Sequence, residues 1–364
     1  MRQLLAERRN LQGLQVRVEP FQEHHLPLIA TFWQRVFPRP QTSSFYRWLY
    51  VDSQPFGRVF LALSGEECLG LVHALRKPYL IGGTSVHCLE SFDWHSLPGL
   101  RGSGVGIWVL RALMRQGERL ITVGGSSDVL AALPALGWQK LATTRRFELP
   151  LSVASLQAGM RRRVRTTIPG ERLALKAIAS WYRPRRRGVL GQMVPVSIPS
   201  SEIHSLYSGE TGYDFLQLPD PTLLRWMTAG YPGNGSFAFL YFTVAGSLRA
   251  WALTRVHETA EGREAAILEV YGAKPDLDLY TWIVSEAATW LSSARPVVIR
   301  ARASCPVLQA ALLANRFRAG AEDPVHTWPK GLPERLRVHV TMNHGDEPVR
   351  PYPDAESATR FLTV

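Results

Sequence analysis

A glycine-rich turn constrains the fold of this chain more than any other feature. It reads Arg101-Gly102-Ser103-Gly104-Val105-Gly106 and joins a predicted strand ending near Trp94 to a predicted helix over residues 107–114. Glycines let the backbone approach a phosphate with its N–H groups turned inward, and the helix dipole places positive charge behind them. The turn therefore predicts a pyrophosphate cradle. A tight turn without any ligand is the alternative interpretation.

The segments around this turn alternate between helix and strand patterns. Before the turn, the patterns predict helices over 26–36 and 44–50 and strands over 58–63, 68–76 and 84–94. After it, they predict a strand over 120–123, a helix over 126–136 and a strand over 139–149. This order, the Arg-x-x-Gly-x-Gly turn and the sequence Ala135-Leu136-Gly137-Trp138 resemble the GNAT (GCN5-related) N-acetyltransferases over about residues 16–150.

A weaker copy of the same order follows in the second half of the chain. It predicts helix starts at 203 and 221, strands over 237–244, 248–256, 265–271 and 297–303, and helices over 277–291 and 306–314. The chain thus resembles tandem-GNAT proteins. The fold class is predicted as α/β (α+β), with two GNAT-like domains that are each a mixed, mostly antiparallel twisted sheet flanked by helices.

The turn of the second copy differs from that of the first. It reads Tyr271-Gly272-Ala273-Lys274-Pro275-Asp276, with one glycine and a proline that lacks an N–H group. We therefore expect the second copy to have lost CoA binding.

Positive charge is concentrated between the two copies. The predicted organisation is an acyl-CoA-binding domain over 1–150, a basic connector over 151–200, a degenerate GNAT-like domain over 201–340 and a tail over 341–364. The connector has ten basic residues and one acid, which gives +9 of the net +12 of the chain. Its arginine clusters, within 161–187, either line a solvated linker or contact an anionic partner: CoA phosphates, a carrier-linked substrate, a membrane surface or RNA.

The three cysteines Cys68, Cys88 and Cys305 are far apart and lack the spacing of metal ligands. We expect them to be buried and reduced, in a cytoplasmic protein that binds no metal. The first residues have no apolar signal-peptide core, and no apolar stretch is long enough to span a membrane.

The resemblance implies a set of CoA-binding residues. A backbone N–H in the stretch Phe92, Asp93 and Trp94 would polarise the thioester carbonyl. The turn would bind the pyrophosphate of acetyl-CoA or another acyl-CoA through Arg101, Gly102, Ser103, Gly104, Val105 and Gly106.

Acyl transfer to an amine also needs a base, and Glu90 is the preferred candidate, with His87 and His95 as alternatives. Strand alternation predicts Glu90 and Phe92 on one face and Ser91 and Asp93 on the other. Many GNAT members place a proton-donating tyrosine in or after the helix that follows the fifth strand. This chain has Ser126 at the start of that helix and no tyrosine between Tyr79 and Tyr182. Either a serine such as Ser126 or water assists the departing thiolate, or a tyrosine of the second half does so, or the thiolate leaves unaided.

The second half supplies candidates for substrate recognition: Trp226, Tyr241, Trp251 and Glu269, the last at a strand position corresponding roughly to Glu90. Aromatic residues in such positions also serve as core. The function predicted from the sequence is acyl-CoA-dependent N-acyl transfer to a primary amine of a small molecule or an envelope or polysaccharide precursor. A Fem-like aminoacyl-tRNA-dependent transferase and a non-catalytic GNAT-like binding partner are the alternatives.

Overall fold

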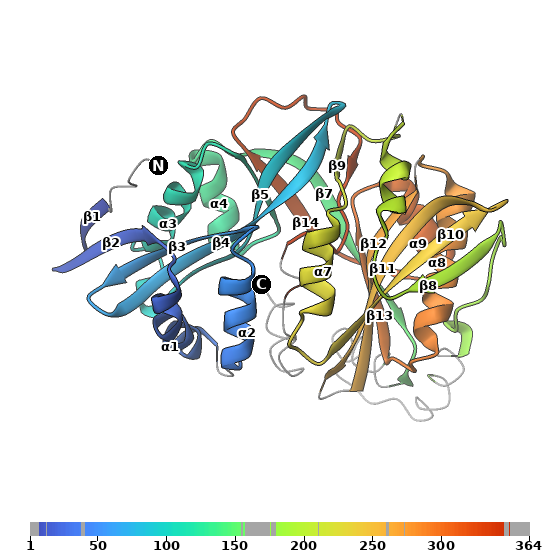
Figure 1. Cartoon of the computed structure of the whole chain (residues 1–364), viewed down its shortest axis with the longest axis horizontal. Coiled ribbons are helices and arrows are strands. Elements are labelled where there is room, and N and C mark those ends of the chain that lie inside the picture. Colours follow the sequence, from blue (N-terminus) through green and yellow to red (C-terminus); the bar gives the residue numbers. More distant parts are fainter. Residues whose placement is uncertain are drawn as a thin grey trace.

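The computed structural model describes residues 7–153, 156, 175 and 180–349, apart from 12, 38–40, 210, 260–261, 273 and 346–348. Arg161, Arg162, Arg163 and Arg165 of the connector and most of the predicted tail lie outside the described residues. The strands of the described part form a single 15-stranded mixed sheet that runs through both halves of the molecule (Figure 1).

The first half is built on antiparallel strands in sequence order. They are β1 (Glu7–Leu11), β2 (Leu14–Pro20), β3 (Gly57–Ser64), β4 (Glu67–Ile81) and β5 (Thr84–Ser96). The elements between β2 and β3 are helical: η1 (Glu23–His25), α1 (Leu26–Val36), α2 (Ser43–Arg47) and the π-helical η2 (Trp48–Asp52). After β5 come η3 (Pro98–Leu100), α3 (Val105–Met114), β6 (Arg119–Val123), α4 (Ser127–Ala135) and β7 (Gln139–Pro150).

The second half repeats this order. Its first elements are β8 (Gln192–Val196), η4 (Ser201–Tyr207), β9 (Phe215–Gln217), α7 (Pro221–Ala229), β10 (Gly235–Val244) and β11 (Ser247–Thr259). They are followed by β12 (Gly262–Gly272), α8 (Leu277–Ser292), β13 (Val298–Ala303), α9 (Pro306–Ala314), β14 (Arg318–Trp328) and β15 (Val338–His339). The predicted helices and strands match these elements closely, whereas β1, β2, β8, β9, β14 and β15 were not predicted.

The last strands of the two halves change places. β14 lies between β6 and β7, and β7 lies between β14 and β13. Ion pairs cross this exchange: Arg146 Nε and Nη2 donate to Asp323 at 2.6 and 2.8 Å, and Arg145 pairs with Glu322. Opposite charges facing each other across strands favour this pairing. We had expected two separate sheets, and the exchange instead makes one sheet that neither half completes alone.

The first-half sheet is covered on both faces by helices. His95 contacts Trp33 and Phe37 at the end of α1, with ring centroids 5.1 and 5.6 Å apart. The indole N–H of the neighbouring Trp94 donates to Gly106 O of α3 at 2.7 Å. Because successive strand residues point to opposite faces, α1 and α3 lie on opposite sides of β5.

The chain after β14 returns to the junction of the two halves. β15 pairs in parallel with β9, and β9 pairs with the end of β4 through Tyr79, Leu80 and Ile81. Thr341 then bridges to Ala303 at the end of β13. Residues 338–345 are therefore buried between the two halves, whereas most of residues 329–337 are exposed.

Candidate active site

The glycine turn adopts the backbone needed to expose a helix N-terminus. Gly102 and Gly104 have φ of +77° and +90°, a region that side chains other than glycine rarely adopt. Gly104 is the N-cap of α3 and has no side chain to accept from the first N–H groups of the helix, although Ser103 Oγ accepts a long hydrogen bond from Val105 N at 3.5 Å. A Cβ atom at Gly102 would meet nothing within 4 Å, so the space above the turn is open. Backbone donors and open space fit a phosphate at this position.

The third glycine of the turn serves packing. A Cβ atom at Gly106 would lie 3.0 Å from the indole nitrogen of Trp94, closer than nearly all real contacts. The hydrogen bond from that nitrogen to Gly106 O then ties the first turn of α3 to β5. The side chain of Trp94 therefore holds the glycine turn in position against β5.

The strands β5 and β6 separate just before Phe92, which begins the stretch predicted to bind the thioester carbonyl. The parallel ladder between β5 and β6 runs from Cys88–Arg119 to Ser91–Thr122 and ends there. β5 continues to Ser96 along β4, while β6 continues along β14. Phe92, Asp93 and Trp94 thus lie just beyond the point where the strands diverge, and their role in binding the carbonyl stays a prediction.

A β-bulge changes which side chains share a face here. Leu75 pairs with Glu90 and His73 pairs with Asp93, so the bulge absorbs one residue of β5 next to Phe92. Cross-strand partners share a face, and residues 73 and 75 lie on the same face of β4. The prediction that alternation separates Glu90 from Asp93 is therefore wrong, and both carboxylates face the side of α1 and α2.

Asp93 lies among aromatic hydroxyl groups. Burial raises the pKa of Tyr46 and raises that of Tyr50 well above its usual value, and the negative charge of Asp93 adds to both shifts. Tyr50 Oη accepts from Trp33 Nε1 at 2.8 Å, and Tyr46 Oη accepts from the Gln41 N–H at 3.1 Å. Two phenols that keep their protons, Tyr46 of α2 and Tyr50 of η2, thus lie within electrostatic reach of Asp93.

Glu90 occupies a different environment, fully buried and surrounded by donors. Lys77 Nζ donates to Oε1 at 2.9 Å, Gly345 N donates to the same oxygen at 2.5 Å, and Tyr79 Oη donates to Oε2. Burial alone would raise the pKa of Glu90, but the charge of Lys77 and the hydrogen bonds from Tyr79 and Lys77 lower it. A carboxylate held ionised by so many donors is a weak base.

The C-terminal segment continues this polar network into the second half. Thr341 Oγ1 donates to Glu269 Oε2 at 2.9 Å, and His339 Nε2 lies 3.2 Å from Glu269 Oε1. His344 Nδ1 accepts from Thr341 N at 3.2 Å. We call Lys77, Tyr79, Glu90, Glu269, Cys305, His339, Thr341 and His344 the central network.

Three side chains of the central network have pKa values that differ from their usual ones: His339, Cys305 and His344. Burial lowers the pKa of His339, but hydrogen bonding to Cys305 and Glu269 and their charges raise it to about 9. Burial raises the pKa of Cys305, but its hydrogen bond to His339 and the imidazolium charge lower it to about 7. Burial lowers the pKa of His344 to about 4 against the opposing charges of Glu90 and Glu269. His339 is thus a cation and His344 a neutral ring at neutral pH.

The other predicted catalytic residues are dispersed. Ser126 is the N-cap of α4, and its Oγ accepts from Val129 N at 3.4 Å. His87 is exposed near the tip of the β4–β5 hairpin, whereas His95 packs between two aromatic rings of the α1 region. The sequence analysis named Asp93 only for its backbone and did not single out Lys77, Tyr79 or His339. Nothing in their local sequence sets them apart.

The helix that corresponds to α3 in the second half is capped by its own side chain. Asp276 is the N-cap of α8, and its Oδ1 accepts from Asp278 N and Leu279 N at 2.9 and 3.1 Å. The N–H groups that a phosphate would need are occupied by a carboxylate, which also repels anions. This difference supports the prediction that only the first half binds CoA.

The predicted substrate residues of the second half have structural partners. Trp226 stacks on Trp48, Tyr241 Oη accepts from Ser200 N at 2.7 Å, and Trp251 Nε1 donates to Tyr207 Oη at 3.0 Å. Counted from the bulge between Leu253 and Thr254, Glu269 is equivalent to Asp93 and not to Glu90. The structure brings Glu269 into the central network and leaves the three aromatic residues in packing positions.

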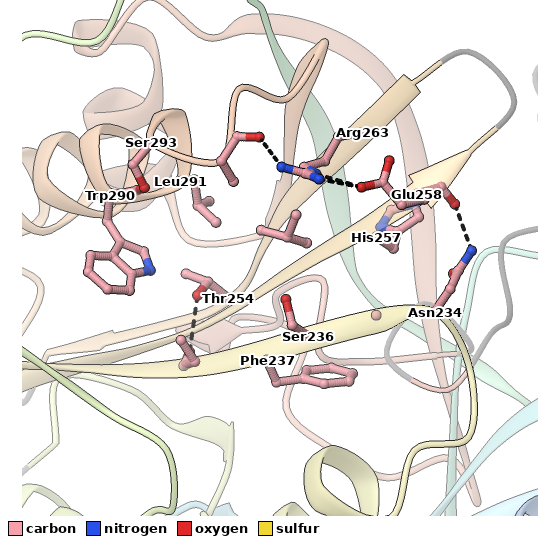
Figure 2. Close-up of a pocket in the computed structure, with 14 residues that line it drawn as sticks. Asn234, Ser236, Phe237, Thr254, His257, Glu258, Arg263, Trp290, Leu291 and Ser293 are labelled. Carbon is pink, nitrogen blue, oxygen red and sulfur yellow. Dashed lines mark hydrogen bonds and ion pairs between the residues drawn. The ribbon is translucent and has the colours of Figure 1, made fainter.

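A cleft of about 590 Å³ opens elsewhere, between β10, β11 and the C-terminal end of α8 (Figure 2). Its polar side chains largely bind one another: Arg263 donates to Glu258 at 2.7 Å and to Ala294 O at 2.8 Å, and Asn234 Nδ2 donates to Glu258 O. None of the predicted site residues lines this cleft, so it is separate from the glycine turn.

Comparison with known proteins identifies the fold. No protein-family profile and no curated protein match the sequence. Among solved structures, N-myristoyltransferase of Saccharomyces cerevisiae with bound myristoyl-CoA superposes with a TM-score of 0.61 at 10% identity, over 90% of this chain and 86% of that one. The chain has a tandem GNAT fold.

Two further structures agree with this assignment. A GCN5-related N-acetyltransferase from Anabaena variabilis has a TM-score of 0.56 at 11% identity, over 85% of this chain and 72% of that one. A probable N-acyltransferase from Enterococcus faecalis has a TM-score of 0.56 at 12% identity, over 86% and 71%. The two GNAT units predicted from the sequence are confirmed, and they share a single sheet.

Metal binding, membrane spans and disulfides can also be examined in the residues that the structure describes. They contain no group of three or more His, Cys, Asp or Glu side chains arranged to hold a metal ion. No helix in the described part of the chain is long and apolar enough to cross a bilayer. All three cysteines are free and buried.

Proposed function

We propose that this protein transfers an acyl group from acyl-CoA to a primary amine, using the first half of the tandem GNAT fold. The observation that carries the proposal is that an uncapped, glycine-initiated helix and a divergent pair of strands lie together in the first half. The CoA pyrophosphate would lie on the N-terminus of α3, held by the N–H group of Gly106 and by that of Val105, whose long hydrogen bond to Ser103 Oγ it would replace. CoA supplies the activated thioester. Two of the three similar structures are named as acyltransferases and the third as a probable one, which supports the same reaction class.

The backbone around Asp93 would polarise the acyl carbonyl, because β5 is released from β6 there. We propose Asp93 rather than Glu90 as the base that takes the proton of the attacking amine. Asp93 is only partly buried, whereas Glu90 is fully buried and held ionised by three donors. Tyr46 keeps its proton because burial raises its pKa, and its hydroxyl accepts from Gln41, so its hydrogen is available for the departing thiolate.

We further propose a short acyl group, acetyl being the preferred one. The helical side of β5 next to Asp93 is filled by Trp33, Phe37, Tyr50 and His95 in mutual ring contacts. Trp33 and Tyr50 are both buried, so a long chain would have to displace a packed aromatic cluster. The acceptor amine would enter from the junction of the two halves, where Asp93 and the central network face.

The test is acyl transfer by the purified full chain. Acetyl-, octanoyl- and myristoyl-CoA would each be supplied with a panel of primary amines, and free CoA thiol and acylated amine measured together. We expect amine-dependent CoA release that is fastest with acetyl-CoA. Faster transfer from myristoyl-CoA would contradict the short acyl group alone, whereas failure of every thioester to bind or react would contradict the proposed function.

A further inference from the structure

The edge of the sheet farthest from the glycine turn carries an unusual surface. β8 is the outermost strand of the second half, and the segment that leads into it runs along the rim of the molecule (Figure 1). Residues 181–198 contain four arginines and no acidic residue. We call the exposed part of this segment, together with Arg316, the rim patch: Trp181, Arg183, Arg185, Arg186, Arg187, Val189, Leu190 and Arg316.

Apolar side chains of the rim patch stand in solvent. Trp181 is 54% exposed, Val189 66% and Leu190 43%, and Val194 and Ile198 are exposed further along the same edge. Single exposed apolar residues are ordinary, but here Val189, Leu190, Val194 and Ile198 follow one another along one edge segment, and exposed apolar residues grouped in this way mark a contact surface. The rim patch therefore has the composition of an interface and not only of a solvated linker.

The arginines are gathered by contacts with folded elements. The backbone N–H of Arg187 donates to Ser285 Oγ of α8 at 3.2 Å, and Arg186 Nε lies 3.6 Å from Glu286. The guanidinium of Arg316 lies 4.3 Å over the ring of Trp181 and donates to the Trp181 carbonyl. Burial and the nearby charges of Arg185 and Arg187 lower the pKa of Arg316. The fold thus brings together like charges that repel one another, and an anionic partner would relieve the repulsion.

We infer that the rim patch binds the surface of an anionic phospholipid bilayer. Arginines attract acidic headgroups, while exposed tryptophan and aliphatic side chains enter the boundary between headgroups and acyl chains. RNA would use the arginines but has no use for the exposed aliphatic side chains of Val189 and Leu190. The combination of charge and exposed aliphatic surface favours the bilayer.

The test is sedimentation of the full chain with vesicles at about 0.1 M salt, where charges farther apart than about 10 Å are screened. We expect binding to vesicles of phosphatidylcholine mixed with phosphatidylglycerol, and little binding to phosphatidylcholine alone. Arg183→Ala with Arg185→Ala should weaken binding by roughly 10- to 30-fold. Val189→Ser with Leu190→Ser should also weaken it, with less dependence on salt.

Matched controls lie on other surfaces. Arg111 and Arg225 are exposed arginines of α3 and α7, and Leu277 is an exposed leucine at the start of α8. Arg111→Ala with Arg225→Ala, and Leu277→Ser, should leave vesicle binding unchanged. Equal loss in the controls, equal binding to neutral vesicles, or an arginine-dependent affinity for tRNA without any for vesicles would overturn the inference. Because the rim patch lies away from the glycine turn, this outcome is independent of acyl-CoA binding.

Discussion

Trp48 and Trp226 join the two halves by a reciprocal contact. Their rings stack with centroids 4.6 Å apart and an angle of 12° between planes. Trp48 Nε1 donates to Trp226 O at 3.2 Å, and Trp226 Nε1 donates to Trp48 O at 3.3 Å. The pair links η2 beside Asp93 to α7 of the second half. It therefore fixes the junction from which we propose that the amine enters.

Changing this pair should cost stability in a graded way. Trp226→Phe keeps a stacked ring but removes one N–H donor, so we expect a loss of about 1 kcal/mol in the free energy of unfolding. Trp48→Ala removes a buried side chain and should cost about 3–5 kcal/mol. Urea unfolding measures both changes, with Trp290→Phe at a more exposed position as the control. If Trp48→Ala is no worse than the control, the two halves are held by other contacts.

Replacing Asp93 by its amide should mainly lower the rate of the reaction, whereas replacing Glu90 by its amide should mainly lower the stability of the fold. Asp93→Asn should lower kcat by about 10²- to 10⁴-fold with the acyl-CoA Kd within a few fold, because a base is lost without a change in binding. Glu90→Gln leaves Lys77 buried without its counter-charge, and should lower the free energy of unfolding by roughly 3 kcal/mol. Steady-state rates and urea unfolding of both variants separate the two roles. The reverse pattern would return Glu90 to the role of base.

Protonation of His344 should contribute to acid sensitivity. Its pKa is lowered by burial from 6.5 to about 4, so between these values the unfolded chain binds a proton that the folded chain does not. The free energy of unfolding therefore falls as pH drops from 6.5 to 4, by roughly 3 kcal/mol from this residue. His344→Asn should remove that part of the slope, whereas His204→Asn, on an exposed residue, should not. An unchanged slope in His344→Asn would show that the ring is already charged in the fold.

Cys305 should titrate at a lower pH than the other two thiols. Hydrogen bonding to His339 and its charge lower the pKa of Cys305 to about 7 despite burial, while burial raises those of Cys68 and Cys88 to about 12. Far-ultraviolet thiolate absorbance of the native protein should show one thiolate forming as pH rises through about 7. The step should vanish in Cys305→Ser, persist in Cys68→Ser and move to higher pH in His339→Asn. A single step at the pH of an ordinary thiol would contradict the pairing with His339.

Local sequence was enough to predict the glycine turn, the helices and most strands, because they depend on short-range periodicity and capping. The exchange of β7 and β14 could not be predicted from local sequence, because it depends on contacts between distant residues such as Arg146 and Asp323, which are 177 residues apart. The bulge next to Phe92 was also invisible, and one inserted residue moved Asp93 to the face of Glu90. Glu90 was predicted as the base, whereas the donors that hold it ionised come from β4 and from the C-terminal segment and could not be foreseen from its own strand.

The central claim is that the uncapped helix of the first half, and not its counterpart, binds the CoA pyrophosphate. Calorimetric titration of the full chain with acetyl-CoA tests it most directly, using Gly104→Asp to give α3 the carboxylate cap that Asp276 gives α8. Asp276→Asn is the matched change in the second half, and thermal melting reports whether each variant folds. We predict that wild type and Asp276→Asn bind with the same affinity while folded Gly104→Asp does not bind. Undiminished binding by Gly104→Asp, or loss of binding in Asp276→Asn alone, would contradict the account.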